Sequence, residues 1–220
     1  MNQPFSILSF LLLFVGSFVQ GHANAQCLSF LTSGSSEGYI PDNGLNCFHD
    51  TAYVSGFAEE ATWGDLPSEL QVVRVAIEHS FMGDLNISFT CPNGTVVLVH
   101  ESMQGLPGLN PGLSLGQPDY TSSNPGVAWS YLWSDASTEG TFAEASAGGN
   151  PPVSLPEGTY APNEGLSGFD GCPLNGTWEI TICDTWSSDD GNLFESQVVD
   201  WVEPVWACEI ENEAGDPETD

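Results

Sequence analysis

The pattern of apolar and polar positions predicts strands along most of the chain, and its most distinct element is a hairpin. Between Leu85 and Cys91, apolar residues alternate with polar ones, which is the period-two pattern of a strand with one buried face. Pro92-Asn93-Gly94 supplies a tight turn, because proline presets φ and Asn-Gly tolerates positive φ. The mostly β-branched residues 95–99 then predict the return strand.

Further short strands follow from the same kind of pattern, and Gly- and Pro-rich segments separate them. No segment carries a 3.6-residue apolar stripe over eight or more residues, so we expect no helices. Many short strands without helices indicate an all-β fold, a β-sandwich. The strands are expected at 27–31, 51–57, 71–79, 129–133, 178–183 and 198–205, with two long surface excursions at 101–124 and 138–162.

The N-terminus has the pattern of a secretory signal peptide. Residues 5–19 form an apolar run, and Ala23-Asn24-Ala25 is a small-x-small cleavage site, although no Lys or Arg precedes the run. Cleavage after residue 25 leaves 220 − 25 = 195 residues, without a further apolar run that could span a bilayer. We therefore expect a secreted protein, extracellular or at the cell surface, with a lead-in segment at 26–38, one domain at 39–206 and an acidic disordered tail at 207–220.

Charge and cysteines narrow the classes of partner. The chain has 30 acidic residues and a single basic one, Arg74. Such a surface repels nucleic acids and anionic membranes and attracts divalent cations; the alternative interpretation is a solvated acidic surface suited to a salty medium. An even number of cysteines behind a signal peptide predicts disulfides. The six cysteines are Cys27, Cys47, Cys91, Cys172, Cys183 and Cys208.

Three blocks of sequence, in the same order, resemble the P domain (Homo B domain) of subtilisin-like proprotein convertases. They are residues 40–44 (IPDNG), residues 79–95 (HSFMGDLNISFTCPNGT), and residues 174–184 (LNGTWEITICD) followed by 190–193 (DGNL). The resemblance implies a jelly roll of roughly eight strands, including a short strand at 158–160. It also implies a domain that stabilises a protease catalytic domain and shapes its dependence on calcium and pH.

Catalytic motifs of that protease family are not found in the sequence. None of His49, His79 and His100 lies in a His-Gly-Thr context, and no Gly-Thr-Ser-x-Ala nucleophile segment exists. We therefore expect a non-catalytic accessory or interaction module, associated with serine endopeptidases and proteolysis by family alone. Its expected partner is a separate secreted protease or a cell-surface component. His79 is expected to be a hydrogen-bonded residue at a strand start.

Carboxylates offer a candidate calcium site between the last two strands. Ca²⁺ takes six to eight oxygen ligands, which residues at the two ends of a hairpin loop can supply together. The alternative is a loop of solvated acids, and Asp84 has a further alternative role in capping the hairpin entry. The candidate ligands are Asp184, Asp189, Asp190 and Asn192, with Asp42 and Asp84 as further candidates.

Aromatic residues suggest a second function class. Trp129, Tyr131 and Trp133 share one face of a strand, as core residues of a sandwich do or as a sugar-stacking platform would. In the second case the protein would be a carbohydrate-binding or adhesive lectin-like sandwich, with a glycan bound by the loops at 101–124 and 138–162. Burial of both tryptophans favours the accessory module, and exposure of both favours the glycan binder.

Six cysteines allow 15 pairings, and the alternating pattern restricts them only in part. Cys183 falls on the opposite face of its strand from Trp178 and Ile182. The P-domain resemblance suggests a Cys27–Cys47 bridge between an early strand and the next segment. Cys91 and Cys172 both lie beside turns and are expected to pair, which leaves Cys183 with Cys208.

Overall fold

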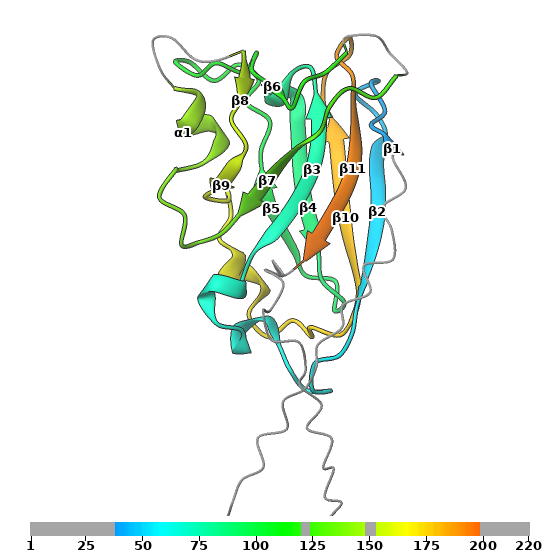
Figure 1. The fold of residues 1–220 in the computed structure, drawn as a ribbon, viewed down its shortest axis with the longest axis vertical. Helices are drawn as coiled ribbons and strands as arrows, with labels where there is room; N and C mark the ends of the chain where they lie inside the picture. The colour runs from blue at the N-terminus through cyan, green and yellow to red at the C-terminus, as the bar shows by residue number, and fades with distance from the viewer. Residues whose placement is uncertain (1–37, 120–123, 148–152, 199–220) are drawn as a thin grey trace, which may run out of the picture.

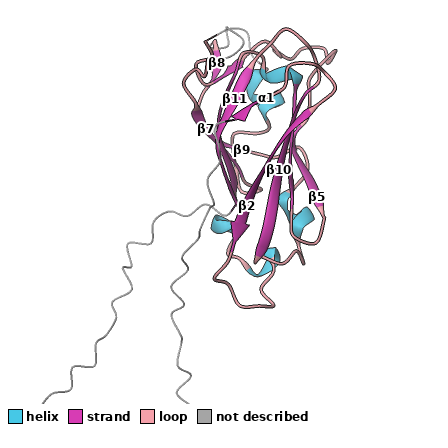
Figure 2. Ribbon diagram, turned by 90° about the vertical axis from the view of Figure 1, so that its right-hand side faces the viewer, coloured by secondary structure: helices cyan, strands magenta, loops and turns pink. Residues whose placement is uncertain are grey.

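The structure, a computed structural model, is a β-sandwich of two packed sheets (Figures 1 and 2). It describes residues 38–119, 124–147 and 153–198. The signal peptide, most of the lead-in segment with its strand at 27–31, and the acidic tail lie outside the described residues, as do Cys27 and Cys208. The expected all-β sandwich is confirmed, and its eight strands of three or more residues agree with the number that the resemblance implied.

The smaller sheet contains the hairpin that the sequence predicted. It has four strands in the order β2-β10-β4-β5, all antiparallel. The hairpin turn places Gly94 at φ 90°, the left-handed conformation that Asn-Gly favours. The strands are β2 (Cys47–Val54), β4 (Leu85–Thr90), β5 (Val96–His100) and β10 (Gly176–Asp184).

The larger sheet has seven strands and faces the smaller one, as Figure 2 shows edge-on. Most pairings are antiparallel, but β6 pairs with β8, and β7 with β9, in parallel. Its strands are β1 (Gly38–Tyr39), β3 (Val73–His79), β6 (Ser114–Leu115), β7 (Trp129–Trp133), β8 (Ser154–Leu155), β9 (Gly158–Tyr160) and β11 (Gly191–Val198).

Short helices interrupt this architecture, contrary to the expectation of none. The α-helix α1 (Phe142–Ser146) begins at a capping box, in which Thr141 and Glu144 bond each other's backbone N–H groups. This Thr-x-x-Glu pattern was readable in the sequence, but five residues are too few to show a helical apolar period. The 3₁₀ turns are η1 (Trp63–Asp65), η2 (Ser68–Leu70), η3 (Met82–Asp84) and η4 (Leu166–Phe169).

The core lies between the sheets and is rich in aromatic side chains. Trp178 on β10 is 0% exposed and packs against Trp63 and Phe169, with ring centroids 5.6 and 5.1 Å away. Its indole N–H donates to the Leu174 carbonyl at 3.0 Å, which satisfies the polar atom of a buried ring. The alternation along β10 is therefore the core pattern that the sequence indicated.

Most expected strands are confirmed, and the differences lie at their ends. β2 begins at Cys47 and ends at Val54, four residues earlier at its start than expected, because it pairs along its whole length with β10. The last described strand, β11, covers Gly191–Val198 and pairs with β3. The strand expected at 198–205 lies, beyond its first residue, outside the described residues.

Of the three expected disulfides, one is confirmed and two are wrong. Cys91 and Cys172 form a bridge with Cα atoms 6.2 Å apart, and both residues are buried. Cys47 pairs with Cys183, with Cα atoms 4.2 Å apart, so neither the Cys27–Cys47 nor the Cys183–Cys208 bridge can form. The reason is register: antiparallel pairing of β2 with β10 places Cys47 directly opposite Cys183.

Candidate functional site

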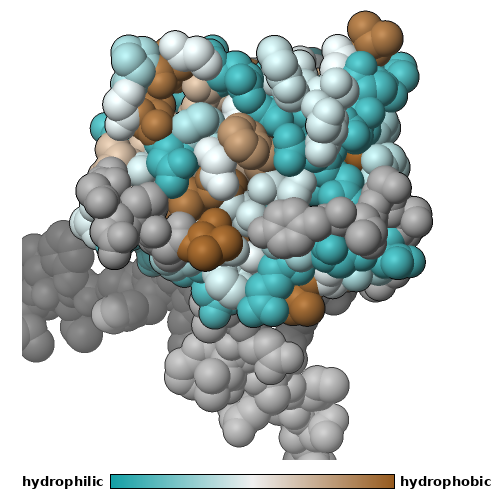
Figure 3. Space-filling model, turned by 90° about the horizontal axis from the view of Figure 1, so that it is seen from above, coloured by the Kyte–Doolittle hydropathy of each residue, from teal (hydrophilic) through white to brown (hydrophobic). Residues whose placement is uncertain are grey.

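The candidate ligands gather at one end of the sandwich because the β10–β11 connection crosses there from one sheet to the other. β10 ends at Asp184 opposite Leu85 of β4, in the smaller sheet. β11 begins at Gly191 opposite His79 of β3, in the larger sheet. The connection therefore passes over the segment that links β3 to β4, which contains η3 (Figure 1). Seen from above, this end presents mostly hydrophilic residues with separate apolar ones between them (Figure 3).

Two carboxyl groups are buried beneath this connection. Asp84, the last residue of η3, is 0% exposed, and Asp184 is 2% exposed. Asp184 Oδ1 accepts from the Trp186 backbone N–H at 3.0 Å, and the Gln104 side-chain amide donates to Asp84 Oδ1. The second oxygen of each carboxyl group, Oδ2, has no hydrogen-bond donor. Buried carboxylates ordinarily satisfy both oxygens, so this arrangement is unusual.

His79 lies against one of these free oxygens. Its Nε2 is 3.3 Å from Asp184 Oδ2, and both side chains are fully buried. The backbone N–H and the carbonyl oxygen of Phe81 both lie near His79 Nδ1, at 3.2 and 3.1 Å. The expected hydrogen-bonded histidine is therefore present, but at the end of β3 and not at a strand start.

The environment of Asp84 opposes its ionisation. Burial, followed by repulsion from Asp184 and Asp189, raises the pKa of Asp84 to about 7. Asp189 thus contributes, after burial and Asp184, to keeping the Asp84 carboxyl group protonated at higher pH than usual.

Backbone contacts hold the connecting loop in place. Ser80 Oγ donates to Asp189 Oδ1 at 3.1 Å and accepts from the Asp190 backbone N–H at 2.9 Å. The Asp42 side chain accepts from the Ser188 backbone N–H at 2.8 Å. Ser188 has φ 103°, a conformation that costs a non-glycine residue about 1–3 kcal/mol, so the surrounding contacts impose it.

The structure separates the sequence-predicted ligands into two groups. Asp184 and Asp189 are close enough to Asp84 to raise its pKa, whereas the amide of Asn192 donates to Glu78 Oε1 at 2.8 Å. Asp190 is 9% exposed, and burial raises its pKa. Sequence reasoning missed Gln104, which lies in the 101–124 excursion and reaches Asp84 only through the fold.

A metal-ligand cluster of the usual kind does not occur in the part of the chain that the structure describes. No three or more His, Cys, Asp or Glu side chains are grouped there so that they could hold a metal ion. Any cation at this end would therefore combine fewer carboxylates with other oxygens, such as amide, carbonyl or water oxygens, which Ca²⁺ accepts.

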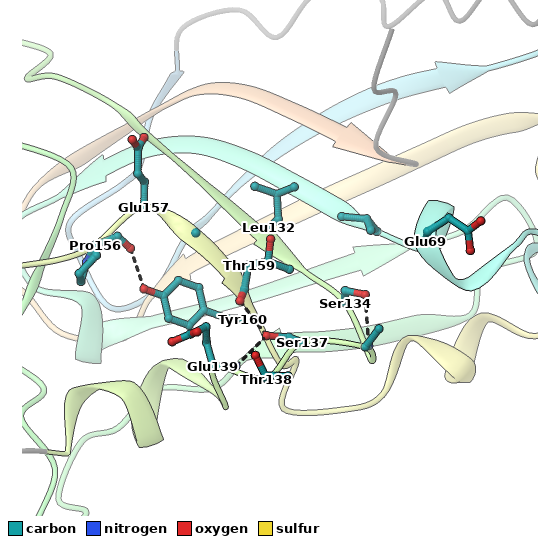
Figure 4. A pocket seen from close by; sticks show the side chains of 13 residues that line it. Glu69, Leu132, Ser134, Ser137, Thr138, Glu139, Pro156, Glu157, Thr159 and Tyr160 are labelled. Atoms are coloured by element: carbon teal, nitrogen blue, oxygen red, sulfur yellow. Dashed lines mark hydrogen bonds between the residues drawn. The ribbon is translucent and has the colours of Figure 1, made fainter. Parts of the chain in front are cut away.

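A pocket of about 670 Å³ lies on another part of the sandwich, along β9 and the end of β7 (Figure 4). Ser137 Oγ donates to the Thr159 carbonyl there at 2.7 Å, and Tyr160 Oη donates to the Pro156 carbonyl at 2.7 Å. Tyr160, the aromatic residue of this lining, is 5% exposed. Part of the 138–162 excursion thus forms a concave surface. Its acidic side chains are Glu69, Glu139 and Glu157.

The aromatic stripe of β7 belongs to the core. Tyr131 and Trp133 are 0% exposed and pack on Phe142 of α1, with ring centroids 5.6 and 5.1 Å away. Trp129 is partly buried and packs against the core. The interpretation of this stripe as core is confirmed for the two fully buried residues.

One family model matches part of the chain. Residues 68–142, from η2 to the start of α1, match the family model of the proprotein convertase P-domain. This match, over about a third of the chain, bears out the resemblance seen in the motifs. In that family the P-domain is a non-catalytic domain of subtilisin-like proteases. No curated protein matches the chain.

Among solved structures, this chain is similar to a protein chain in the crystal structure of the complex between the Aeromonas sobria serine protease and its chaperone. The identity is 15%, the TM-score is 0.26, and the match covers 76% of this chain. The chain spans 24% of the length of that protein chain.

Proposed function

We propose that this chain is a secreted, non-catalytic interaction module whose partner is a subtilisin-like serine protease. The observation that carries the proposal is the P-domain match over residues 68–142. This segment contains the β4–β5 hairpin together with β3, β6 and β7 of the larger sheet. P-domains accompany proteases of this class, so a protease is the protein partner that the family favours.

The surroundings of the described histidines support a role without catalysis. His79 lies against Asp184 in the interior, and His100 donates from Nε2 to the Met82 carbonyl at 3.0 Å. His49 is exposed on the outer face, where Glu179 and Thr181 contact its Nδ1. His79 and His100 are both 0% exposed, so a substrate does not reach their imidazoles, whereas a general base must lie within hydrogen-bond reach of the proton that it removes.

The described disulfides support an oxidising compartment outside the cytosol. Both bridges, Cys47–Cys183 and Cys91–Cys172, join segments far apart in the sequence, as structural disulfides of secreted domains do. Within the described part of the chain, no helix has the length and hydropathy of a membrane span.

Burial of the β7 aromatics disfavours the carbohydrate-binding alternative. Trp133 is inaccessible and Trp129 is only partly exposed, so the pair does not offer a flat ring surface to a sugar. The lining of the pocket beside β9 contributes one aromatic ring, Tyr160, which is buried against Phe142 with centroids 4.9 Å apart. Glycan binding by ring stacking has no platform among these residues.

The experiment that tests the proposal is capture from the medium of the source organism. Immobilised chain is incubated with culture medium whose active serine hydrolases carry a fluorophosphonate label, and chain unfolded by reduction and alkylation serves as the control. We expect a labelled subtilisin-like protease on the folded chain alone. Equal labelling of both supports, or inhibitor-sensitive peptidase activity in the purified chain itself, would contradict the proposal.

A further inference from the structure

The pocket beside β9 is a groove on the outer face of the larger sheet (Figure 4). Leu132 of β7 lies opposite Arg74 of β3 and opposite Thr159 of β9, and residues directly opposite each other on neighbouring strands share one face of a sheet. Val73 and Val75, which flank Arg74 on β3, are 0% exposed, so the row of Arg74, Leu132 and Thr159 faces away from the core. The volume of the groove, about 670 Å³, is in the range of ligand pockets.

Hydrogen bonds to β9 hold the walls of the groove in place. The Ser134 backbone N–H donates to the Tyr160 carbonyl at 3.0 Å, and Ser137 Oγ donates to the Thr159 carbonyl at 2.7 Å. Tyr160 Oη donates to the Pro156 carbonyl at 2.7 Å. The loop after β7 and the turn between β8 and β9 are thus both tied to β9, so the groove is preformed, as ligand pockets usually are.

The groove combines an apolar floor with an acidic rim. Its buried or half-buried lining includes Val72, Leu132 and the ring of Tyr160. Its exposed lining includes three glutamates, which come from three different segments: η2, the loop after β7, and the turn between β8 and β9. They are Glu69, Glu139 and Glu157.

The negative charge of this rim has no basic side chain to balance it. Among the described residues that line the groove, none is basic. Arg74, the single Lys or Arg of the sequence, turns toward β11, where its guanidinium donates to Gln197 at 3.2 Å and lies 3.5 Å from Glu195. A concave surface lined by charge of one sign attracts ligands of the other sign. The groove therefore favours a cation that also carries an apolar stem.

We propose that this groove binds a lysine side chain carried by an extended segment of a partner protein. The four-carbon stem of the lysine lies along the apolar floor, and its ammonium group stays at the rim, as lysine side chains do on apolar surfaces. The ammonium is a compact charge with three donors, which suits carboxylates that come from three segments. Exposed ion pairs contribute little each, so the residues on either side of the lysine supply the remaining contacts. The inference concerns any partner with such a segment and does not depend on the partner being a protease.

The experiment follows the backbone amide signals of the purified, ¹⁵N-labelled chain by NMR during titration with the peptide acetyl-Gly-Ala-Lys-Ala-Gly-amide. The same peptide with Nε-acetyl-lysine is the matched control, because acetylation removes the charge and keeps the stem. We expect the lysine peptide to shift the signals of Glu139 and Thr159, and the acetylated peptide to bind about tenfold more weakly. Equal binding of the two peptides, or signal shifts confined to residues outside the groove, would overturn the proposal.

Variants separate the groove from the acidity of the whole chain. The double variant Glu139→Gln, Glu157→Gln should bind the lysine peptide about five- to tenfold more weakly, because it loses two of the three rim carboxylates. The control Glu59→Gln, Asp170→Asn removes the same charge at two exposed acids outside the lining and should bind as wild type does. Equal weakening in both double variants would show that net charge attracts the peptide and would overturn the proposal.

Butylamine tests whether the occupant is a protein segment. It carries the same stem and charge as a lysine side chain but no flanking residues, so it should bind more weakly than the lysine peptide. Binding of butylamine as tight as that of the peptide would make the groove a site for free amines and would contradict the proposal.

Discussion

Acidification is expected to destabilise the sandwich through His100, the last residue of β5. The side chain is 0% exposed, its Nε2 donates to the Met82 carbonyl at 3.0 Å, and its Nδ1 is buried without a partner. The ring packs on Phe142 with centroids 5.0 Å apart. Burial lowers the pKa of His100 to about 4 from 6.5, because an imidazolium would be enclosed by apolar groups.

The sign and size of the effect follow from this shift. Below pH 6.5 the unfolded chain protonates His100 while the folded chain does not, so the contribution to stability is complete above pH 6.5 and is lost as the pH falls toward 4. One pKa unit corresponds to about 1.4 kcal/mol, so the contribution of neutral His100 to the free energy of unfolding is about 3 kcal/mol. About 2 kcal/mol of this contribution is already lost at pH 5.

The assay is the free energy of unfolding in guanidinium chloride from pH 8 to pH 5. His100→Gln keeps an N–H donor and does not titrate, and His49→Gln is the matched control at an exposed histidine. Since other groups titrate in the same range, the quantity of interest is the difference between wild type and His100→Gln, which should change by about 2 kcal/mol. Equal pH dependence of both proteins would refute the argument.

Two further predictions concern the covalent and aromatic core. Replacing Cys91 and Cys172 by Ser removes a bridge between residues 81 positions apart and should lower the free energy of unfolding by about 4–5 kcal/mol. Peptide mapping of the wild-type protein without reduction should recover a Cys47–Cys183 peptide, and a Cys27–Cys47 peptide would contradict the register of β2 with β10. Trp178→Ala, at 0% exposure, should cost about 3–5 kcal/mol by denaturant titration, and a loss below 1 kcal/mol would show that the site is not packed as described.

The apolar and polar pattern of the sequence was sufficient to predict structure where all the residues involved lie in one short segment. The hairpin β4–β5 was predictable because alternation and the Asn93-Gly94 turn agree, and Gly94 has the expected positive φ. The orientation of Cys183, away from the core face of β10, followed from the same period of two. Its partner did not, because the pairing of β2 with β10 is a contact across 136 residues that no local pattern records.

The candidate site was only partly predictable for the same reason. Asp184 and Asp189 lie on one loop, and their proximity could be read from a hairpin pattern. Asp84 and Gln104 join them because β4 pairs with β10 and because the excursion after β5 folds back over η3, where the Met103 backbone N–H donates to the Gly83 carbonyl at 2.8 Å. Which oxygen of a carboxylate lacks a donor depends on such tertiary contacts and is not encoded in spacing.

The proposed role as a partner of a serine protease is tested most directly by the heat inactivation of the captured protease. Its residual activity is measured after heating, with an equimolar amount of the folded chain and, in parallel, with the reduced and alkylated chain. A partner that binds the native protease stabilises it by mass action, so the folded chain should lengthen the half-life several-fold. The same half-life with the folded and the unfolded chain would contradict the account.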